Sequence, residues 1–475
     1  MHVVMFGDQH VETLGGAQVS MRLQRRFLEL AGHTVTIVAP AAHGERARSI
    51  APDAAYLDIP SMPITFDREY SMSWPGRNTD RWVDAALAAR PPVDVVHVQA
   101  DFWGAFIGHR YAARHKLPLV HTMHNRVDVG IEATAPFPGV VLATLNTWQR
   151  ASLDVQSSGD ADGSDGWAFL RRFAGRSHAV TAPSTHFARR LEEHGVVPGG
   201  RRGILDLHSP DSHVDVVWNG IDDEILDATL AEAPIERVAG PARLVWLGRM
   251  SPEKRLLPFL EALAESGVRA EVEVIGGGGQ LAAARRLVSR SKPAATVVFA
   301  GRLPYAETLR RIAAADAVVQ TSIGFETQGM TIFEAASLGT PSIVSDPDLA
   351  AELGSGFWPV GGGRAAADST AALAGGGGAP RRWGAADPVA VTAEERGGPR
   401  GDSRARARHW RCGRGEHERG ARDRRPAAES WCPRSAAAAR YGGRCGRRRA
   451  CGGRGSEAAA YRGRPRGAAA RKWCS

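Results

Sequence analysis

The sequence predicts an α/β fold made of two Rossmann-like domains, each with a parallel sheet. Three observations predict it: short apolar, β-branched runs alternate with stretches of helical spacing, several of these runs end in glycine-bearing loops, and the alternation occurs twice within about 360 residues. Strands that alternate with helices are typical of a parallel sheet covered on both faces. A length of about 360 residues is enough for two domains of ordinary size, each with its own core.

The first half begins with a strand at His2–Phe6, and a helix follows at Ala17–Leu30. Between them lies the glycine pair Gly15 and Gly16. Glycines before a helix let the backbone come close to a phosphate or a sugar, although a plain tight turn is the alternative. Further strands are predicted at Thr34–Ala39, Val95–Val98, Leu119–Met123, Ala179–Ala182 and Val214–Val217.

Two histidines lie at the end of the strand Leu119–Met123. His121 is predicted to be structural, and His124 lies just beyond the strand. The segment Trp218–Asp222 is predicted to be a turn, because asparagine and glycine tolerate positive φ.

The second half repeats the pattern over residues 240–375. The loop Gly276–Gly279 lacks the spacing of a dinucleotide fingerprint, and no ribose-binding acid follows it in the required place. Strands are predicted at Arg243–Leu247, Val272–Ile275, Thr296–Ala300, Ala317–Gln320 and Ser342–Ser345, with helices near Lys254–Ser266, Gln280–Ser289 and Tyr305–Ala315.

Two cations follow the strand Arg243–Leu247. The segment Ser251-Pro252-Glu253 is typical of a helix start with proline at its first position. Arg249 and Lys254 would then lie at the carboxyl end of a strand, where open parallel sheets bind ligands. Arginine can bind phosphate oxygens through two N–H groups and lysine adds a point charge, so the pair suits a phosphate, with ordinary surface cations as the alternative.

Two glutamates, Glu326 and Glu334, lie eight positions apart around Gly329. The glycine and the apolar segment after it predict a loop that turns into a helix, with Glu326 before the helix and Glu334 about two turns inside it. The helix start would offer unpaired N–H groups and partial positive charge to a diphosphate, while the two acids could bind hydroxyls of a sugar and a ribose. A solvated helix face is the alternative for glutamates at this spacing.

Together these motifs resemble the retaining glycosyltransferases of family 4. The segment around Glu326 and Glu334 resembles the family's pair of glutamates with seven residues between them, although Thr327-Gln328 replace its usual Gly-Phe. Arg249 and Lys254 match the family's glycine-arginine and the lysine five residues later, which hold the diphosphate. The resemblance covers about residues 1–360 and also includes Gly15-Gly16, His124 and Trp218–Asp222.

The resemblance implies a GT-B architecture, in which two facing Rossmann-like domains have the cleft between them. Residues 1–222 would bind the acceptor and residues 240–375 the donor. The implied reaction transfers a hexose from a nucleotide diphosphate sugar to an acceptor hydroxyl with retention at the anomeric carbon. A sugar-nucleotide epimerase or a phosphorylase has the same fold, and an inactive truncated product of such a gene is a further alternative.

The resemblance also implies roles for the candidate residues. Glu326 would hold the sugar, Glu334 the ribose, and His124 the acceptor-side face, so Glu326 and His124 are the catalytic candidates. No Asp-x-Asp cluster lies beside the phosphate motif, so the transfer is predicted to need no metal ion. Arg249 and Lys254 would neutralise the diphosphate instead. The remaining donor contacts would be Gly15, Gly16 and the backbone amides of Gly329, Met330 and Thr331.

No cofactor is expected, since the nucleotide sugar is a substrate. The expected acceptor is a glycan, a lipid or a small molecule. No cysteine occurs before Cys412, which excludes a disulfide scaffold in the first 411 residues and indicates a reducing cytoplasm. The start Met1-His2-Val3 lacks a secretory signal and no apolar run approaches the ~20 residues that span a bilayer, so a cytoplasmic location is predicted, with contact at the inner face of the membrane left open.

The sequence changes character from about Gly361 onward, where Arg, Gly and Ala dominate. Residues 361–475 hold 26 Lys and Arg against 10 Asp and Glu, a net charge of +16, so with +9 for the whole chain residues 1–360 carry −7. No Leu, Ile, Met or Phe follows Leu373. Because so few aliphatic side chains cannot offset a cost of about 1–2 kcal/mol per ordered residue, residues 376–475 are predicted to be a disordered basic tail.

Three interpretations of this tail compete. Arg/Gly-rich segments bind nucleic acid, and polybasic segments bind anionic lipids. The third interpretation is out-of-frame translation of a GC-rich gene, which the abrupt loss of hydrophobic periodicity within an unfinished Rossmann-like half favours. On that interpretation the tail carries no information on function, and no specific nucleic acid is expected as a partner.

Overall fold

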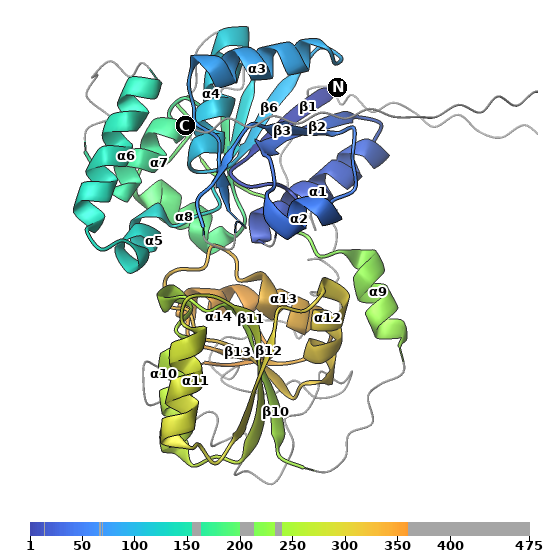
Figure 1. Cartoon of the computed structure of the whole chain (residues 1–475), viewed down its shortest axis with the longest axis vertical. Helices are drawn as coiled ribbons and strands as arrows, with labels where there is room; N and C mark the ends of the chain where they lie inside the picture. Colours follow the sequence, from blue (N-terminus) through green and yellow to red (C-terminus); the bar gives the residue numbers. More distant parts are fainter. Residues whose placement is uncertain are drawn as a thin grey trace, which may run out of the picture. The chain divides into compact units, whose positions relative to one another are not determined.

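The computed structural model describes residues 1–13, 15–65, 68, 70–153, 163–199, 213–232 and 240–359. They form two halves, each built on a parallel sheet with helices around it, as the alternating pattern predicts (Figure 1). The predicted basic tail at 376–475 and the end of the predicted second domain at 360–375 lie outside the described residues.

The first half contains a seven-stranded sheet in the order β3-β2-β1-β6-β7-β8-β9, and all of its neighbouring strands pair in parallel. The interior strand β1 is buried at every residue, which explains its continuous apolar run. The strands are β1 (His2–Gly7), β2 (Thr34–Pro40), β3 (Tyr56–Ile59), β6 (Val95–Gln99), β7 (Leu119–Thr122), β8 (Ala179–Ala182) and β9 (Asp215–Val216), and a separate hairpin pairs β4 (Met62–Pro63) with β5 (Ser71–Met72).

Aromatic side chains fill much of the core between this sheet and its helices. Phe106 packs against Phe169 and Phe173, and all three are fully buried. The helices of this half are α1 (Gly16–Leu30), α2 (Gly44–Ser49), α3 (Arg77–Ala88), α4 (Trp103–His115), α5 (Val127–Thr134), α6 (Pro138–Ser152), α7 (Gly166–Ala174) and α8 (Thr185–Glu193), and α9 (Asp223–Ala231) follows them.

The second half contains a six-stranded parallel sheet in the order β12-β11-β10-β13-β14-β15. Its strands are β10 (Ala242–Arg249), β11 (Ala270–Gly277), β12 (Thr296–Gly301), β13 (Ala317–Gln320), β14 (Ser342–Val344) and β15 (Phe357–Pro359). Its helices are α10 (Leu256–Ser266), α11 (Leu281–Ser291), α12 (Tyr305–Ala314), α13 (Met330–Ser337) and α14 (Pro347–Leu353).

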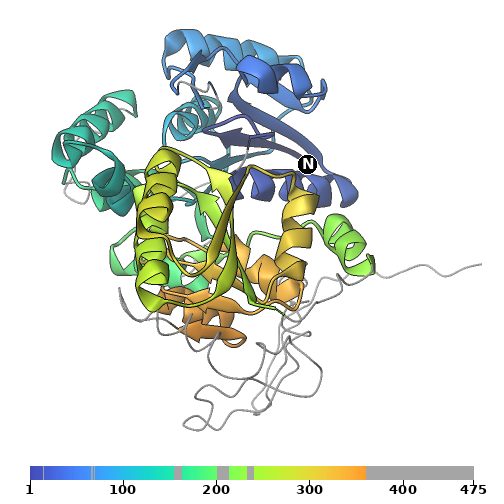
Figure 2. The ribbon, with the colours of Figure 1, turned by 60° about the horizontal axis from the view of Figure 1, so that its bottom comes forward.

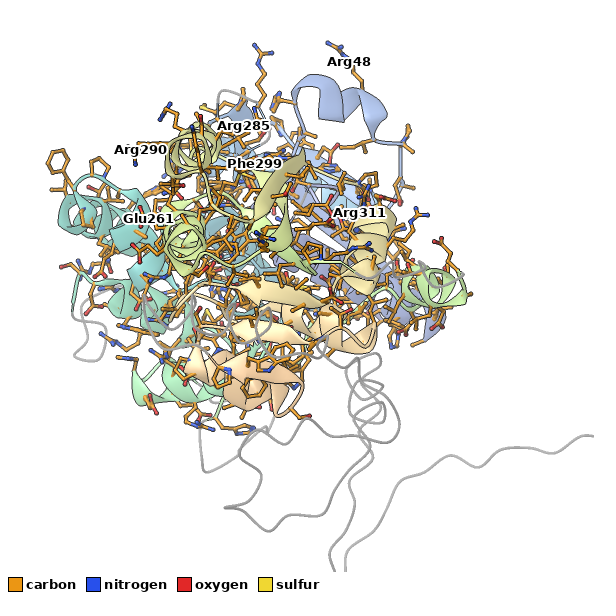
Figure 3. The ribbon with its side chains drawn as sticks, turned by 90° about the horizontal axis from the view of Figure 1, so that it is seen from below. Arg48, Glu261, Arg285, Arg290, Phe299 and Arg311 are labelled. Atoms are coloured by element: carbon orange, nitrogen blue, oxygen red, sulfur yellow. The ribbon has the colours of Figure 1, made fainter. Side chains whose placement is uncertain are left out.

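Helices cover both faces of this second sheet. The helices α10 and α11 lie side by side on one face and α12 on the other, as Figures 1 and 2 show. In Figure 3, Glu261 of α10 and Arg285 of α11 lie to one side of Phe299 on β12, and Arg311 of α12 lies to the other. The guanidinium carbon of Arg285 is 5.8 Å from the centroid of the Phe299 ring.

The structure corrects some details of the prediction. The segment predicted to start the helix near Lys254 forms a 3-10 turn at Pro252–Lys254, and α10 begins at Leu256 because Arg255 adopts a left-handed conformation with φ 55°. Glu334 lies in the second turn of α13, closer to its start than predicted. The short strands β3 and β15, at edge positions of their sheets, were not predicted.

In each sheet the strand order reverses beside the first strand, which is β1 in the first half and β10 in the second. The position of this reversal indicates where a site can form. Chain connections leave β1 toward β2 on one side, while β6 lies on the other; β10 has the same relation to β11 and β13. In open α/β sheets, ligands bind at the carboxyl ends of the strands at such a reversal. The loops after β1, β6, β10 and β13 are therefore the expected site loops. They contain four of the predicted residues, Gly15, Lys254, Glu326 and Gly329.

Candidate functional site

Lys254 and Glu326 form an ion pair, although they are 72 residues apart. Lys254 ends the loop after β10, and Glu326 lies in the loop after β13, the neighbouring strand. The hydroxyl of Ser322 also donates to Glu326, at 2.8 Å. Only 22% of the Lys254 side chain and 12% of the Glu326 side chain are exposed, so the pair is largely removed from water.

The surroundings of Glu326 keep its carboxylate ionised. Burial by itself raises the pKa, but the charge of Lys254 and hydrogen bonds from Lys254, Ser322 and Gln320 outweigh it, and the net effect is a lowered pKa. An ionised, largely buried carboxylate accepts strong hydrogen bonds, which suits it to hydroxyl groups of a sugar.

A chain of hydrogen bonds fixes the position of Lys254. The indole of the buried Trp246 donates to the hydroxyl of Thr321 at 2.9 Å, and that hydroxyl donates to the carbonyl oxygen of Lys254 at 2.6 Å. Thr321 follows β13 and Trp246 lies within β10, so these contacts join the loops on the two sides of the reversal.

The loop that carries Glu326 leads into α13, which begins at Met330. Gly329 precedes it in a left-handed conformation, which favours glycine, and a Cβ there would lie 3.0 Å from the end of the Leu349 side chain, which would have to shift. The amides at the start of a helix have no intrahelical acceptor, as predicted for Met330 and Thr331. A Cβ on Gly16 would lie 3.4 Å from the sulfur of Met330, so the starts of α1 and α13 are neighbours and the two predicted donor-binding segments come together.

Glu334 is buried within α13, and the hydroxyl of Tyr305 donates to it at 3.0 Å. Burial raises its pKa to about 7, against the lowering effect of this hydrogen bond. Glu334 therefore exchanges its proton near neutral pH and can both accept and donate hydrogen bonds. The sequence prediction did not include Tyr305.

Arg249, at the end of β10, contacts Tyr70 of the first half. Its guanidinium donates to the hydroxyl of Tyr70 at 2.6 Å and lies over the Tyr70 ring, with 5.2 Å between the guanidinium carbon and the ring centroid. Gly15 precedes α1 and is exposed. Contacts therefore connect Gly16 with Met330 and Lys254 with Glu326. Arg249 instead contacts Tyr70.

His124 is connected to the Glu326 loop through the backbone. The hydroxyl of Thr327 donates to the carbonyl oxygen of His124 at 3.0 Å, which brings the two predicted catalytic residues into one region. Burial, with neighbouring His97 and His121, lowers the pKa of His124 to about 3, so its ring is neutral at pH 7. Its Nε2 lies 3.1 Å from Oε1 of Gln99. His121 is fully buried against His109, as expected of a structural residue.

The sequence prediction missed two carboxyl groups near His124, the partly buried Asp8 and the fully buried Asp101. Asp8 follows β1 and accepts from the amides of Asp101, Phe102 and Gly104, which lie just before and within the first turn of α4. Asp101 follows β6, and the side chain of Asn125 donates to it at 2.6 Å. Burial raises the pKa of Asp8 to about 6, and burial together with the charge of Asp8 raises the pKa of Asp101 to about 8.

The missed residues gave weak signals in the sequence. Asp8 and Asp101 each follow a predicted strand at the reversal of the sheet, and that position alone could have marked them. Tyr305 and Tyr70 belong to no motif. Within the described part of the chain, no group of three or more His, Cys, Asp or Glu residues could hold a metal ion.

Comparisons with known proteins identify the family of the chain. Residues 14–225 match the family model described as Glycosyltransferase Family 4, and residues 231–354 match the model described as Glycosyl transferases group 1. The chain belongs to the family 4 glycosyltransferases. It is 23% identical over 347 residues to the alpha-monoglucosyldiacylglycerol synthase of Streptococcus pneumoniae, covering 72% of this chain and 70% of that protein.

Solved structures show that the fold is GT-B. Sucrose-phosphate synthase from Thermosynechococcus elongatus has a TM-score of 0.54 at 14% identity, and Anabaena HepE in complex with UDP and glucose has 0.52 at 15%. Each likeness covers 78% of this chain and 89% of the other. No helix among the described residues is long and apolar enough to cross a membrane.

Proposed function

We propose that this glycosyltransferase moves a hexose from a nucleotide diphosphate sugar to an acceptor hydroxyl with retention at the anomeric carbon, and that it does so without a metal ion. The observation that carries the proposal is the Lys254–Glu326 ion pair, which lies at the strand reversal, with Glu326 in the loop that leads into α13. This arrangement places a cation, a carboxylate and helix-start amides within one segment of structure.

Residues 240–375 would form the donor half. The diphosphate would take its positive partners from Lys254 and Arg249 and from the amides of Met330 and Thr331, in the role that metal ions have in other transferases. Gly16, beside Met330, leaves room for the phosphates to approach. Glu334, with a pKa of about 7, would hold the ribose hydroxyls together with Tyr305.

Residues 1–222 would form the acceptor half. Glu326 would hold the hydroxyls of the transferred sugar, and the neutral ring of His124 would contact the reacting face.

The acceptor would be a glycan, a lipid or a small molecule. The name of the streptococcal relative refers to a glucosylated diacylglycerol, so diacylglycerol is the first acceptor to test, and a lipid would bring the chain to a membrane surface.

The test is a donor screen with the purified full chain. UDP-glucose is the first donor, because HepE was solved with UDP and glucose, and other nucleotide hexoses follow. We expect transfer to continue in EDTA and the product anomer, read by NMR, to match the donor's. Inverted product, or transfer only with added divalent metal, would contradict the proposal. A sugar epimerised at C2 in the absence of acceptor would indicate the epimerase instead.

A further inference from the structure

The loop that carries Glu326 belongs to the second half, but side chains of the first half donate hydrogen bonds to it. Three of its backbone carbonyl groups accept hydrogen bonds from side chains of the first half. Arg126 donates to Gly324 at 2.7 Å, His186 Nε2 lies 3.2 Å from the carbonyl oxygen of Glu326, and the hydroxyl of Ser184 donates to Thr327. Ser184 caps the start of α8 and His186 lies in its first turn, so two of the three donors are fixed by a helix start.

Two side chains of the loop contact the first half in return. The hydroxyl of Thr327 donates to the carbonyl of His124 at 3.0 Å. The amide of Gln328 makes two hydrogen bonds to the backbone of Asn219, accepting from its N–H and donating to its C=O, both at 3.1 Å. Gln328 and Asn219 are buried, so water cannot replace these bonds at low cost.

Thr327 and Gln328 are also the two positions at which this chain departs from the Gly-Phe of the family motif. Neither glycine nor phenylalanine has a side chain that could make these hydrogen bonds. The carboxylate of Glu326 is held by Lys254 and Ser322 of its own half, whereas its backbone is held by the first half. The two sets of contacts are separable by mutation.

We propose that Thr327 and Gln328 are positioning residues that fix the Glu326 loop to the His124 and Asn219 segments, so that the carboxylate meets the transferred sugar in the reactive geometry. The proposal rests on the function proposed above. Because a displacement of about 1 Å at a reacting centre can lower the rate ~100-fold, loosening this loop affects the chemical step first. Binding of the nucleotide depends on other groups and should change little.

The test compares Thr327→Val and Gln328→Met with the unaltered chain, alone and combined. Both substitutions nearly preserve volume while removing the hydrogen bonds. We expect kcat to fall about 10- to 100-fold in the combined variant, with the Kd for the nucleoside diphosphate and the donor KM within about 2-fold. Thr327→Ser, which keeps the hydroxyl, should restore kcat to near the unaltered value.

Thr340→Val is the matched control. Thr340 is a buried threonine whose hydroxyl donates to the carbonyl of Ile312 at 2.9 Å, and it lies outside the Glu326 loop. This variant loses the same kind of bond, so any fall in kcat equal to that of Thr327→Val would show a general effect of destabilisation and overturn the proposal. A loss of nucleotide affinity as large as the loss of kcat would overturn it too.

Amide exchange gives a readout that needs no activity. The N–H of Asn219 donates to Gln328, so Gln328→Met should speed its exchange, while Thr340→Val should not. If the unaltered chain transfers no sugar, the proposed function fails and exchange decides this inference: equal exchange at Asn219 and across residues 322–329 in variant and unaltered chain overturns it. Faster exchange with unchanged kcat in an active chain also overturns it.

Discussion

Replacing Lys254 with methionine should destabilise the second half, because it leaves the carboxylate of Glu326 largely buried without its cation. Removal of one partner from a buried ion pair costs about 3–5 kcal/mol. Both side chains of this pair keep some exposure, 22% for Lys254 and 12% for Glu326, so we expect about 2–3 kcal/mol. For a unit of this size, that corresponds to a fall in Tm of about 5–15 °C.

A second substitution distinguishes two causes of the destabilisation: loss of the Lys254–Glu326 attraction, and burial of an unpaired Glu326 carboxylate. Glu326→Gln removes the charge and keeps a group that can accept from Ser322. If the cost of Lys254→Met comes mainly from an unpaired carboxylate, the double variant should be about 1–2 kcal/mol more stable than Lys254→Met alone. Lys292→Met, at an exposed lysine that ends α11, is the matched control and should change Tm little.

The stability of the unaltered chain and of Lys254→Met should depend on pH in different ways, because Glu326 ionises differently in the two. Glu326 has a lowered pKa in the folded chain, so its contribution to stability is present above its ordinary value of 4.5 and is lost as the pH falls through the lowered value. In Lys254→Met, burial acts unopposed by the lysine and raises the pKa, so the deficit in Tm should shrink on acidification from pH 7 to pH 5. A deficit independent of pH, with additive effects in the double variant, would refute this reasoning.

Four further outcomes are expected. Glu334, whose raised pKa of about 7 favours the folded chain when protonated, should contribute stability that is lost as the pH rises from 4.5 to 7, and thermal melts of Glu334→Gln should lack this slope. Gly329→Ala should cost about 1–2 kcal/mol or more in melts, since an alanine there adopts a left-handed conformation against Leu349. Asp101→Asn should leave Tm at pH 7 nearly unchanged and raise it above pH 8, because burial already keeps this carboxyl protonated at neutral pH. Sequencing of the gene around codons 360–380 should reveal an alternative frame rich in Leu and Ala codons, and a closed frame would contradict the out-of-frame interpretation of the tail.

The interior strands of both sheets were predictable because they are buried on both faces. In β1 and β13 this burial requires uninterrupted apolar runs, which stand out from amphipathic helices. Strands at the sheet edges bury less and run shorter. The two-residue strand β9 and the three-residue β15 carry too few apolar residues to give a pattern, so the first was predicted too long and the second was missed.

The sequence indicated candidate residues one by one, but it could not predict the contacts between them. The motif around Lys254 indicates a cation and the motif around Glu326 an acid, but their pairing depends on β10 and β13 being neighbours, which spacing along the chain does not encode. The contacts of Arg249 with Tyr70 and of Glu334 with Tyr305 are likewise made between segments distant in sequence. The roles assigned to these residues in transfer stay predictions.

The cap that Asp8 provides for α4 bears on the order of folding. The amides it binds come 93 to 96 residues later in the chain, so the helix gains its cap only after β1 has paired with β6. Closing so long a loop is slow compared with forming a helix. During refolding, the amides of Phe102 and Gly104 should therefore gain protection from exchange together with the strands, and later than the middle of α4.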